Sequence, residues 1–265
     1  MAGVRRWTSA ALGAAALLGL FVTWEVAFRL TALDPALFPP PSRIARTALR
    51  LLAPTPDRGS ILLTHTLVSL ARLAAGLTLG VALGGFLGLA AGLNRYAYRA
   101  LYPILNALIP IPAYAWVPIL LLWLGQGSPT IVVTTAVSAA LPLAYATMAG
   151  VRAVDQRQVW ALQSLGAGRS GVIRWVILPA ALASIISGLR LSFGQAWRTL
   201  VGAEFLASFD AGLGFLIYSA RQFLAIDVMF TGILTLGVFG FLLVYWLVGR
   251  LEEWTVVRWG VLARR

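Results

Sequence analysis

The chain has 265 residues, of which 60% are hydrophobic and 11% are charged, and its mean hydropathy is +0.85. Soluble domains carry about 25% charged residues, so this composition predicts an integral membrane protein. The net charge of +12 comes from 21 basic residues, all of them arginine. These arginines are scattered between apolar runs and form no basic stripe, which argues against nucleic acid as a partner. The absence of cysteine excludes disulfides and thiolate metal sites.

The first apolar run follows a pair of arginines and continues for about 18 residues, which is enough to cross a bilayer. A basic start and an apolar run are also typical of a signal peptide. This run, however, ends at Trp24 and Glu25, where a cleavage site would have small residues. We therefore expect a first membrane span at about 8–30 with an aromatic residue at the interface.

The longest uncharged stretch lies between Arg99 and Arg152. As one straight helix it would be about 78 Å long, more than twice a hydrocarbon core of about 30 Å. It must therefore fold into a hairpin, and the glycines and proline at 125–129 predict its turn. Together with the other apolar runs, this predicts an all-α integral membrane protein with six transmembrane helices. Their predicted positions are about 8–30, 65–93, 100–124, 129–150, 179–206 and 228–249.

The arginines also predict how the spans are oriented. With a cytoplasmic N-terminus, most arginines outside the spans fall in the inner segments, as the positive-inside rule requires. Both termini are therefore expected in the cytoplasm. One basic segment, 39–52, is predicted to lie outside. Its arginines and its apolar residues fall on different faces, which predicts an amphipathic helix on the membrane surface with Ser42 as its N-cap.

The second predicted span has a glycine at every fourth position. Small residues at this spacing let another helix approach closely, which is how helices associate in lipid. The sequence leaves open whether the partner helix belongs to the same chain or to another subunit. The glycines assigned to helix packing are Gly76, Gly80, Gly84, Gly88 and Gly92.

The third predicted span contains Pro103, Pro110, Pro112 and Pro118. Each proline removes a backbone donor from the helix. So many missing donors predict a broken or bent helix, which lipid-embedded proteins tolerate where protein or a water-filled cavity satisfies the freed carbonyls. We therefore expect this span to border a pathway through the membrane.

Motifs for bond chemistry are missing. The sequence has no HExxH, no GxSxG and no phosphate-binding GxxxxGK[ST]. His65 has no second histidine or carboxylate at ligand spacing, so neither a catalytic role nor a metal site is expected. The chain is therefore predicted not to be an enzyme and to bind no ATP itself.

The fifth predicted span carries a polar stripe. Arg190, Trp197 and Glu204 are seven residues apart and share one helical face, and Gln195 and Arg198 flank it. Two interpretations stay open. The charged groups pair within the bundle or reach the interface, or they face a central pathway.

The segment 151–178 lies between the fourth and fifth spans on the predicted cytoplasmic side. Its pattern predicts two short amphipathic helices, the second from Ser170 to Val176, separated by Gly166 and Gly168. Such helices either rest on lipid or dock into a groove of a partner protein. Composition alone does not separate these two.

Resemblance to a known protein family favours docking to a partner protein. Gly166, followed ten residues later by Val176 and then by Leu178 and Pro179, is similar to the cytoplasmic loop signature of ABC importer permeases. In that family the loop forms a coupling helix that sits in a cleft of the ATP-binding subunit. This chain departs from the pattern at Trp160, where the family has an acidic residue. The resemblance assigns ATPase coupling to Val159, Trp160, Ala161, Leu162, Leu165, Gly166, Ala167, Arg169, Leu178 and Pro179.

Three further segments, in the same order along the chain, resemble the nitrate, sulfonate and taurine branch of these permeases. They are Phe38–Ser42, Leu108–Pro118, and Gly188–Glu204 followed by Gly212–Gly214. The resemblance implies a MetI-like type I importer fold. It divides the chain into an N-terminal transmembrane helix with an external amphipathic helix (1–64) and a core permease domain of five spans (65–265) that carries the coupling loop.

The family also implies partners and a location. These are a second copy of the permease, two ATPase subunits that bind ATP and Mg²⁺, an external substrate-binding protein, membrane lipid, and the bacterial cytoplasmic (inner) membrane. The expected substrate is a small anion such as a sulfonate, taurine or nitrate, although the same branch includes permeases for vitamin precursors. A secondary transporter or channel and a small intramembrane enzyme are the alternatives. Residues assigned to the pathway are Pro110, Pro112, Trp116, Arg190, Gln195, Trp197, Arg198 and Glu204.

Overall fold

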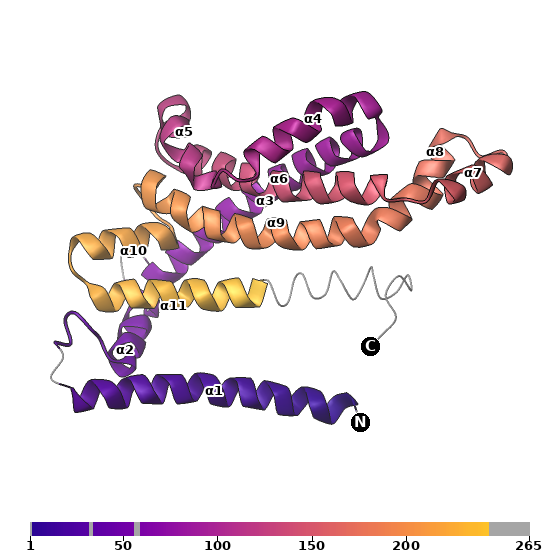
Figure 1. The fold of residues 1–265 in the computed structure, drawn as a ribbon. Coiled ribbons are helices and arrows are strands. Elements are labelled where there is room, and N and C mark those ends of the chain that lie inside the picture. The colour runs from indigo at the N-terminus through magenta and orange to yellow at the C-terminus, as the bar shows by residue number, and fades with distance from the viewer. Residues whose placement is uncertain (1, 32–33, 56–58, 244–265) are drawn as a thin grey trace.

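The computed structural model describes residues 2–31, 34–55 and 59–243, and over these residues the chain is built of helices with no β-strand (Figure 1). α7 and α8 lie at one end of the molecule and α5 and α10 at the other (Figure 1). In chain order the elements are α1 (Ala2–Leu30), α2 (Pro41–Leu52), α3 (Ile61–Leu93), α4 (Arg95–Leu108), η1 (Ala113–Trp116), α5 (Val117–Leu124), α6 (Ser128–Arg152), α7 (Gln156–Ser164), α8 (Arg169–Val172), the π-helix η2 (Ile173–Ile177), α9 (Leu178–Ala207), α10 (Leu213–Gln222) and α11 (Ile226–Leu242).

Three long helices form the centre of the molecule. α6 packs against both α3 and α9, and it is the most buried of the three. The central core combines apolar residues of these helices with Val117 of α5, and Ile131, Leu200 and Ala203 are fully buried in it. The remaining elements surround this three-helix centre.

Within the described residues, α3, α6 and the continuous run Arg169–Ala207 are long and apolar enough to cross a membrane. The bent pair formed by α4 and by η1 with α5 adds a fourth crossing if it counts as one span. The sixth predicted span, 228–249, coincides with α11 as far as Leu242 and then leaves the described residues. Six spans therefore remain a prediction.

The third predicted span is broken, as its prolines predict. α4 and the segment Ala113–Leu124 are bent by 92° relative to each other. Pro110 lies in the break, and Pro112 directly precedes η1. The hairpin turn is also confirmed, because Gly125 and Gly127 between α5 and α6 have φ of 74° and 107°, where glycine is favoured.

The predicted N-cap of the amphipathic helix is wrong. α2 begins at Pro41, and Ser42 lies inside its first turn. The Ser42 backbone N–H and hydroxyl both donate to the carboxylate of Glu25 on α1, at 3.1 and 3.0 Å. Proline suits the first helical position because the missing amide hydrogen would be unpaired there. A carboxylate from the neighbouring helix replaces the local cap, and its charge suits a helix N-terminus.

The predicted second helix of the loop, Ser170 to Val176, is not a separate element. α8 continues through the π-turn η2 into α9 without interruption. Pro179 lies in the first turn of α9. Proline is tolerated at that position, so the Leu-Pro pair begins the long helix and does not close the short one.

The glycine stripe of α3 faces α6 of the same chain. A Cβ added at Gly80 would lie 2.6 Å from the Ala136 carbonyl oxygen, and one at Gly84 would lie 2.5 Å from the Ala140 carbonyl oxygen. The same holds at the other three positions, where α6 atoms would lie 2.6–2.7 Å away. The stripe therefore brings two backbones of one subunit together.

A matched pair of substitutions tests this contact. Gly84→Ala should lower stability by about 1–3 kcal/mol, because the added methyl group forces α3 away from α6. Gly85→Ala adds the same atom where nothing lies within 4 Å, so it should leave stability unchanged or slightly raised. Melting temperatures of the purified variants in detergent measure the difference, and equal values would contradict the packing.

Candidate functional site

α7 forms the tip of the loop at one end of the molecule (Figure 1). The Asp155 side chain caps its N-terminus by accepting the Arg157 N–H at 2.9 Å. At the other end, the Gly166 N–H donates to Gln163 O at 2.9 Å and the Ala167 N–H donates to Leu162 O at 3.2 Å. This bond pair is a Schellman motif, which requires a left-handed residue. Gly166 supplies it with φ of +87°.

The loop presents large apolar side chains. Trp160 is 61% exposed, Leu165 is 83% exposed and Trp175 is 70% exposed. Exposed apolar patches of this kind mark surfaces that contact a protein or a membrane. Of the other residues assigned to coupling, Ala161, Gly166 and Arg169 are exposed and Val159, Leu162, Ala167, Leu178 and Pro179 are half-buried. Leu178 and Pro179 belong to the first turn of α9 and not to the loop tip.

A cleft of about 540 Å³ opens beside the break between α4 and η1. It is bounded by α4, the break, α6 and α9. Its lining is uncharged, and its polar side chains are those of Asn106, Ser138, Tyr145, Gln195 and Thr199. Small-molecule sites have this combination of apolar walls and a few polar groups.

The cleft gathers some of the predicted pathway residues and leaves others out. Pro110, Pro112 and Gln195 line it. Trp116 is half-buried near the break, and Arg190 and Arg198 are exposed on α9 without lining the cleft. Trp197 is buried in the central core. Glu204 belongs to a different site.

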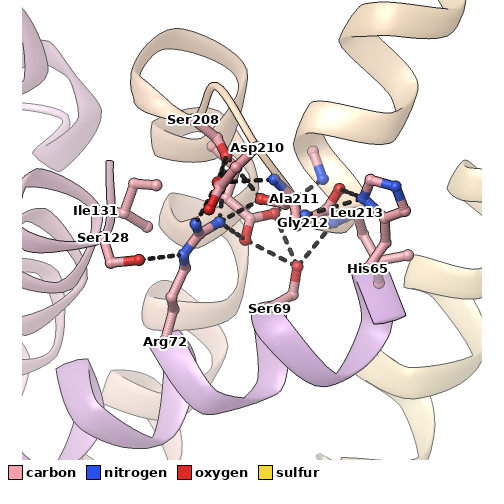
Figure 2. A network of polar contacts seen from close by, with 12 residues as sticks. His65, Ser69, Arg72, Ser128, Ile131, Ser208, Asp210, Ala211, Gly212 and Leu213 are labelled. Atoms are coloured by element: carbon pink, nitrogen blue, oxygen red, sulfur yellow. Dashed lines mark hydrogen bonds and ion pairs between the residues drawn. The ribbon is translucent and has the colours of Figure 1, made fainter. Parts of the chain in front are cut away.

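That site is a buried polar network at the end of the bundle opposite α7 (Figure 2). Its centre is Arg72 of α3, whose side chain is 4% exposed. The guanidinium donates to Glu204 Oε1 at 3.2 Å, to Ser128 Oγ at 2.9 Å and to Asp210 Oδ1 at 3.0 Å. One side chain of α3 thereby holds α6, α9 and the loop that leads to α10.

Glu204 is fully buried and its carboxylate is satisfied on several sides. Ser69 Oγ lies 2.8 Å from each carboxylate oxygen, and the Gly214 N–H donates to Oε2 at 2.9 Å. Gly212 has φ of +128°, and a Cβ there would lie 2.5 Å from the carboxylate. These contacts pack the loop onto Glu204, so glycine is required at that turn.

Asp210, in the loop after α9, is the exposed acidic partner of Arg72 in this network. Partial burial alone would raise the pKa of its carboxyl group. The Ala211 N–H bond and the adjacent Arg72 guanidinium outweigh burial and hold the pKa below its ordinary value. The carboxylate is therefore charged at neutral pH and remains paired with Arg72.

Sequence reasoning missed Arg72 and Ser69. A signal was present, because His65, Ser69 and Arg72 follow at i, i+4 and i+7 and so share one face of the helix. In the structure all three point to the same loop, and His65 Nδ1 lies 2.9 Å from Gly212 O (Figure 2). Within the described residues, no three histidine, aspartate or glutamate side chains are grouped to hold a metal ion.

Comparison with known proteins identifies the chain. Residues 80–256 match the family described as the binding-protein-dependent transport system inner membrane component. The chain belongs to this family. It is accordingly a permease subunit of an ABC importer in the inner membrane, it works with ATPase and binding-protein partners, and it is not an enzyme.

Three relatives cover most of the chain. The taurine transport system permease protein of Escherichia coli (strain K12) is 37% identical and covers 90% of this chain and 86% of its own. The bicarbonate transport system permease protein of Synechococcus elongatus is 30% identical, with 91% and 89% covered. The nitrate import permease protein of Synechocystis sp. is 30% identical, with 87% and 84% covered. The predicted nitrate, sulfonate and taurine branch is confirmed.

A solved structure confirms the predicted MetI-like fold. The MetNI methionine ABC transporter in an inward-facing conformation matches with a TM-score of 0.64 at 19% identity. The match covers 74% of this chain and 96% of that chain. At this identity the likeness concerns the fold alone.

The buried ion pair generates a stability prediction. Arg72→Met should lower the stability by about 3–5 kcal/mol, because it leaves the Glu204 carboxylate buried and unpaired. The double variant Arg72→Met, Glu204→Gln removes both charges and should recover much of that loss. Melting curves in detergent for Arg72→Met, Glu204→Gln and the double variant, compared with the wild type, form a double-mutant cycle that measures the coupling between the two side chains.

The exposed pair of Arg29 and Glu25 is the matched control. These side chains are 2.8 Å apart on α1, and Arg29 is 72% exposed. Arg29→Met should barely move the melting temperature, because exposed ion pairs contribute little. If Arg72→Met behaved like Arg29→Met, the network would not be the constraint inferred here.

Proposed function

We propose that two copies of this chain form the translocation pathway of an importer for a small oxyanion, and that α7 transmits ATPase movements to it. The observation that carries the proposal is the loop tip. A capped helix closed by a Schellman turn presents exposed Trp160 and Leu165 at one end of the bundle. An aromatic side chain in the centre of an interface is typical of a dominant binding residue, so Trp160 would replace the family's acidic contact by an apolar one.

The charge distribution supports a cytoplasmic position for this end. Arg157, Arg169 and Arg174 lie in the loop, and Arg152 at the end of α6 stacks over Tyr98 at 3.8 Å. Figure 1 shows that α1 begins on the side of the molecule that carries α7. Under the positive-inside rule, this distribution supports the proposal that the N-terminus and the coupling loop are cytoplasmic and that the Arg72 network is at the external end. The C-terminus, which lies outside the described residues, is proposed to be cytoplasmic as well.

We propose the same two domains as above. α1 and α2 lie within 1–64, and the proposed core of 65–265 contains α6, α9, the cleft and the loop. α3 (Ile61–Leu93) begins before the proposed boundary and continues into the core. The family match lies within the second part. The first part is therefore proposed as an accessory to the core permease domain, and the binding protein is proposed to deliver its cargo at the external end.

The proposed mechanism is alternating access, driven by a difference in docking free energy. ATP and Mg²⁺ bound by the two ATPase subunits favour one arrangement of those subunits. α7 can shift the permease only by the difference between its docking free energies in the two arrangements. The permease itself contributes positioning and a path, and no bond is made or broken on it.

The cleft supports a small oxyanion as cargo. Taurine, bicarbonate and nitrate, named for the relatives, are small and carry negatively charged oxygens. The amide and hydroxyl groups of Asn106, Gln195 and Thr199 can donate hydrogen bonds to such oxygens. With no fixed positive charge in the lining, the ion would be held weakly and released readily. Selection among anions is then assigned to the binding protein.

Two glycines in one loop test the coupling role. Gly166→Ala places a side chain at a left-handed φ, which costs roughly 1–2 kcal/mol, and should misalign α7. Gly168→Ala adds the same methyl group at φ of −73° with open space around it. In a detergent pull-down, we expect the Gly166→Ala variant to retain little of its partner ATPase. It should also lose transport-coupled ATP hydrolysis.

The Gly168→Ala variant should retain ATPase binding and transport-coupled hydrolysis. The two variants should have the elution volume and melting temperature of the wild type, because the loop lies outside the bundle. Equal retention of the ATPase by the two variants would refute the coupling role of the corner. Failure of the folded wild type to bind the ATPase would refute the assignment of the whole loop.

A charge placed in the cleft tests the pathway. Gln195→Glu should reduce uptake of nitrate or bicarbonate by at least about tenfold, because a like charge at close range repels the passing anion. The matched control is Gln222→Glu, the same change on an exposed residue at the end of α10. Uptake into proteoliposomes containing the complete transporter is the measurement. Wild-type uptake by Gln195→Glu would show that the anion does not pass this residue.

A further inference from the structure

A second cavity lies on the other side of the molecule, between α1, α2, α3 and α11. It is a groove of about 570 Å³, a size typical of small-molecule sites. Leu18 and Phe21 of α1, Ile44 of α2, Leu63 of α3 and Val238 of α11 are among its lining residues. Its walls are almost entirely hydrocarbon.

The few polar groups in the groove are already used. The hydroxyls of Thr66, Thr231 and Thr235 each donate to the backbone carbonyl four residues earlier in their own helix, at 2.7–2.8 Å. A ligand inside the groove therefore finds no free hydroxyl donor among them. This lining suits a hydrocarbon chain and is unsuited to a polar solute.

α1 is held at its outer end, beyond the groove. Glu25 accepts the two hydrogen bonds from Ser42 of α2. One residue earlier, the Trp24 ring lies 6.0 Å from that of Phe38 and 5.4 Å from that of Phe230 on α11. Leu18, at the groove, lies inward of these contacts along α1. The groove thus lies between α1 and the bundle, on the N-terminal side of the contacts that Trp24 and Glu25 make.

α2 places positive charge above the groove. It carries Arg43, Arg46 and Arg50, and Asp227 lies 3.9 Å from the first and 3.4 Å from the last. Three arginines and one aspartate leave a local charge of +2. Arg46 is exposed, lies on the face of α2 turned away from the groove-lining Ile44 and Ala48, and forms no ion pair within the described part of the chain. The charge is thus not cancelled by the protein itself.

We propose that one anionic phospholipid of the outer leaflet binds here, with an acyl chain in the groove and its phosphate on Arg46. An amphipathic helix lies at the level of the headgroups, with its apolar face toward the acyl chains. A groove beneath α2 is then at acyl-chain depth, while the arginines are at phosphate depth. A phospholipid with a net negative charge matches both features at once. The bound lipid fills the space between α1 and the bundle and holds the accessory helices to the permease core.

Lipid retention by the full purified chain tests the proposal. The protein in detergent is given phosphatidylglycerol, phosphatidylcholine with the same acyl chains, or soluble glycerol phosphate. Native mass spectrometry counts retained lipids, and the melting temperature is recorded in parallel. We expect one phosphatidylglycerol per chain to survive detergent removal and to raise the melting temperature, with several-fold lower retention of phosphatidylcholine. Glycerol phosphate should have no effect.

Matched variants locate the site. Arg46→Gln should remove the preference for phosphatidylglycerol and Arg46→Lys should retain it. Arg221→Gln removes an exposed arginine on α10, away from the groove, and should behave as the wild type. Ala48→Leu extends a groove-lining side chain and should lower retention of both lipids.

Three outcomes would overturn the proposal. Equal retention of the two lipids by the wild type would remove the role of the headgroup charge. An equal effect of glycerol phosphate would show an anion site without a lipid. An unchanged preference in Arg46→Gln, which is exposed and should not disturb folding, would show that the lipid binds elsewhere.

Discussion

The structure depends on the close approach of α3 and α6. Lipid offers helices no hydrophobic drive to associate, so they need backbone contact and hydrogen bonds. The glycine stripe provides this contact from Gly76 to Gly92 of α3, and α6 packs against α9 as well. The cleft, the loop and the polar network all take their positions from these three helices. A single methyl group between α3 and α6 would disturb each of them.

The buried charges of the Arg72 network, at the end of the bundle opposite α7, have a different effect. Glu204 and Arg72 would each be costly alone in such a position, and they are tolerated because they pair with each other and each forms several hydrogen bonds. Such a network stabilises one arrangement of the helices, because a shifted arrangement would leave buried charges without partners. It fixes the register of α9 against α3 and the path of the loop that follows. The cleft by contrast has no charged lining, so the protein separates its structural charges from the route proposed for the cargo.

Local signals in the sequence predicted a large part of this architecture. Proline spacing predicted the broken span, the glycines at 125 and 127 predicted the hairpin turn, and Gly166 predicted the corner of the loop. Each of these depends on the backbone preferences of one residue, which are readable without tertiary contacts. The family resemblance added the fold and the branch.

The misses involve partners that are distant in the sequence. Ser42 was expected to cap α2, but it binds the carboxylate of Glu25, 17 residues earlier in the sequence. Glu204 pairs with Arg72, which lies 132 residues earlier. Nothing local in either segment identifies the partner. The run through Leu178 and Pro179 was missed for another reason. Proline is compatible with both the end of one helix and the first turn of the next, and packing decides between them.

The uninterrupted run from Arg169 to Ala207 has a mechanical consequence. These 39 residues form a continuous helical run of about 58 Å, with the loop that carries α7 at one end and Glu204 near the other. In the proposed orientation, a tilt imposed on the end that carries the loop would move the Glu204 end as well, because the run is continuous. The wider turn at Ile173–Ile177 is the one irregular segment of the run, and π-turns often occur at functional positions. If the loop couples to the ATPase as proposed, this turn is the place where the run would bend most readily.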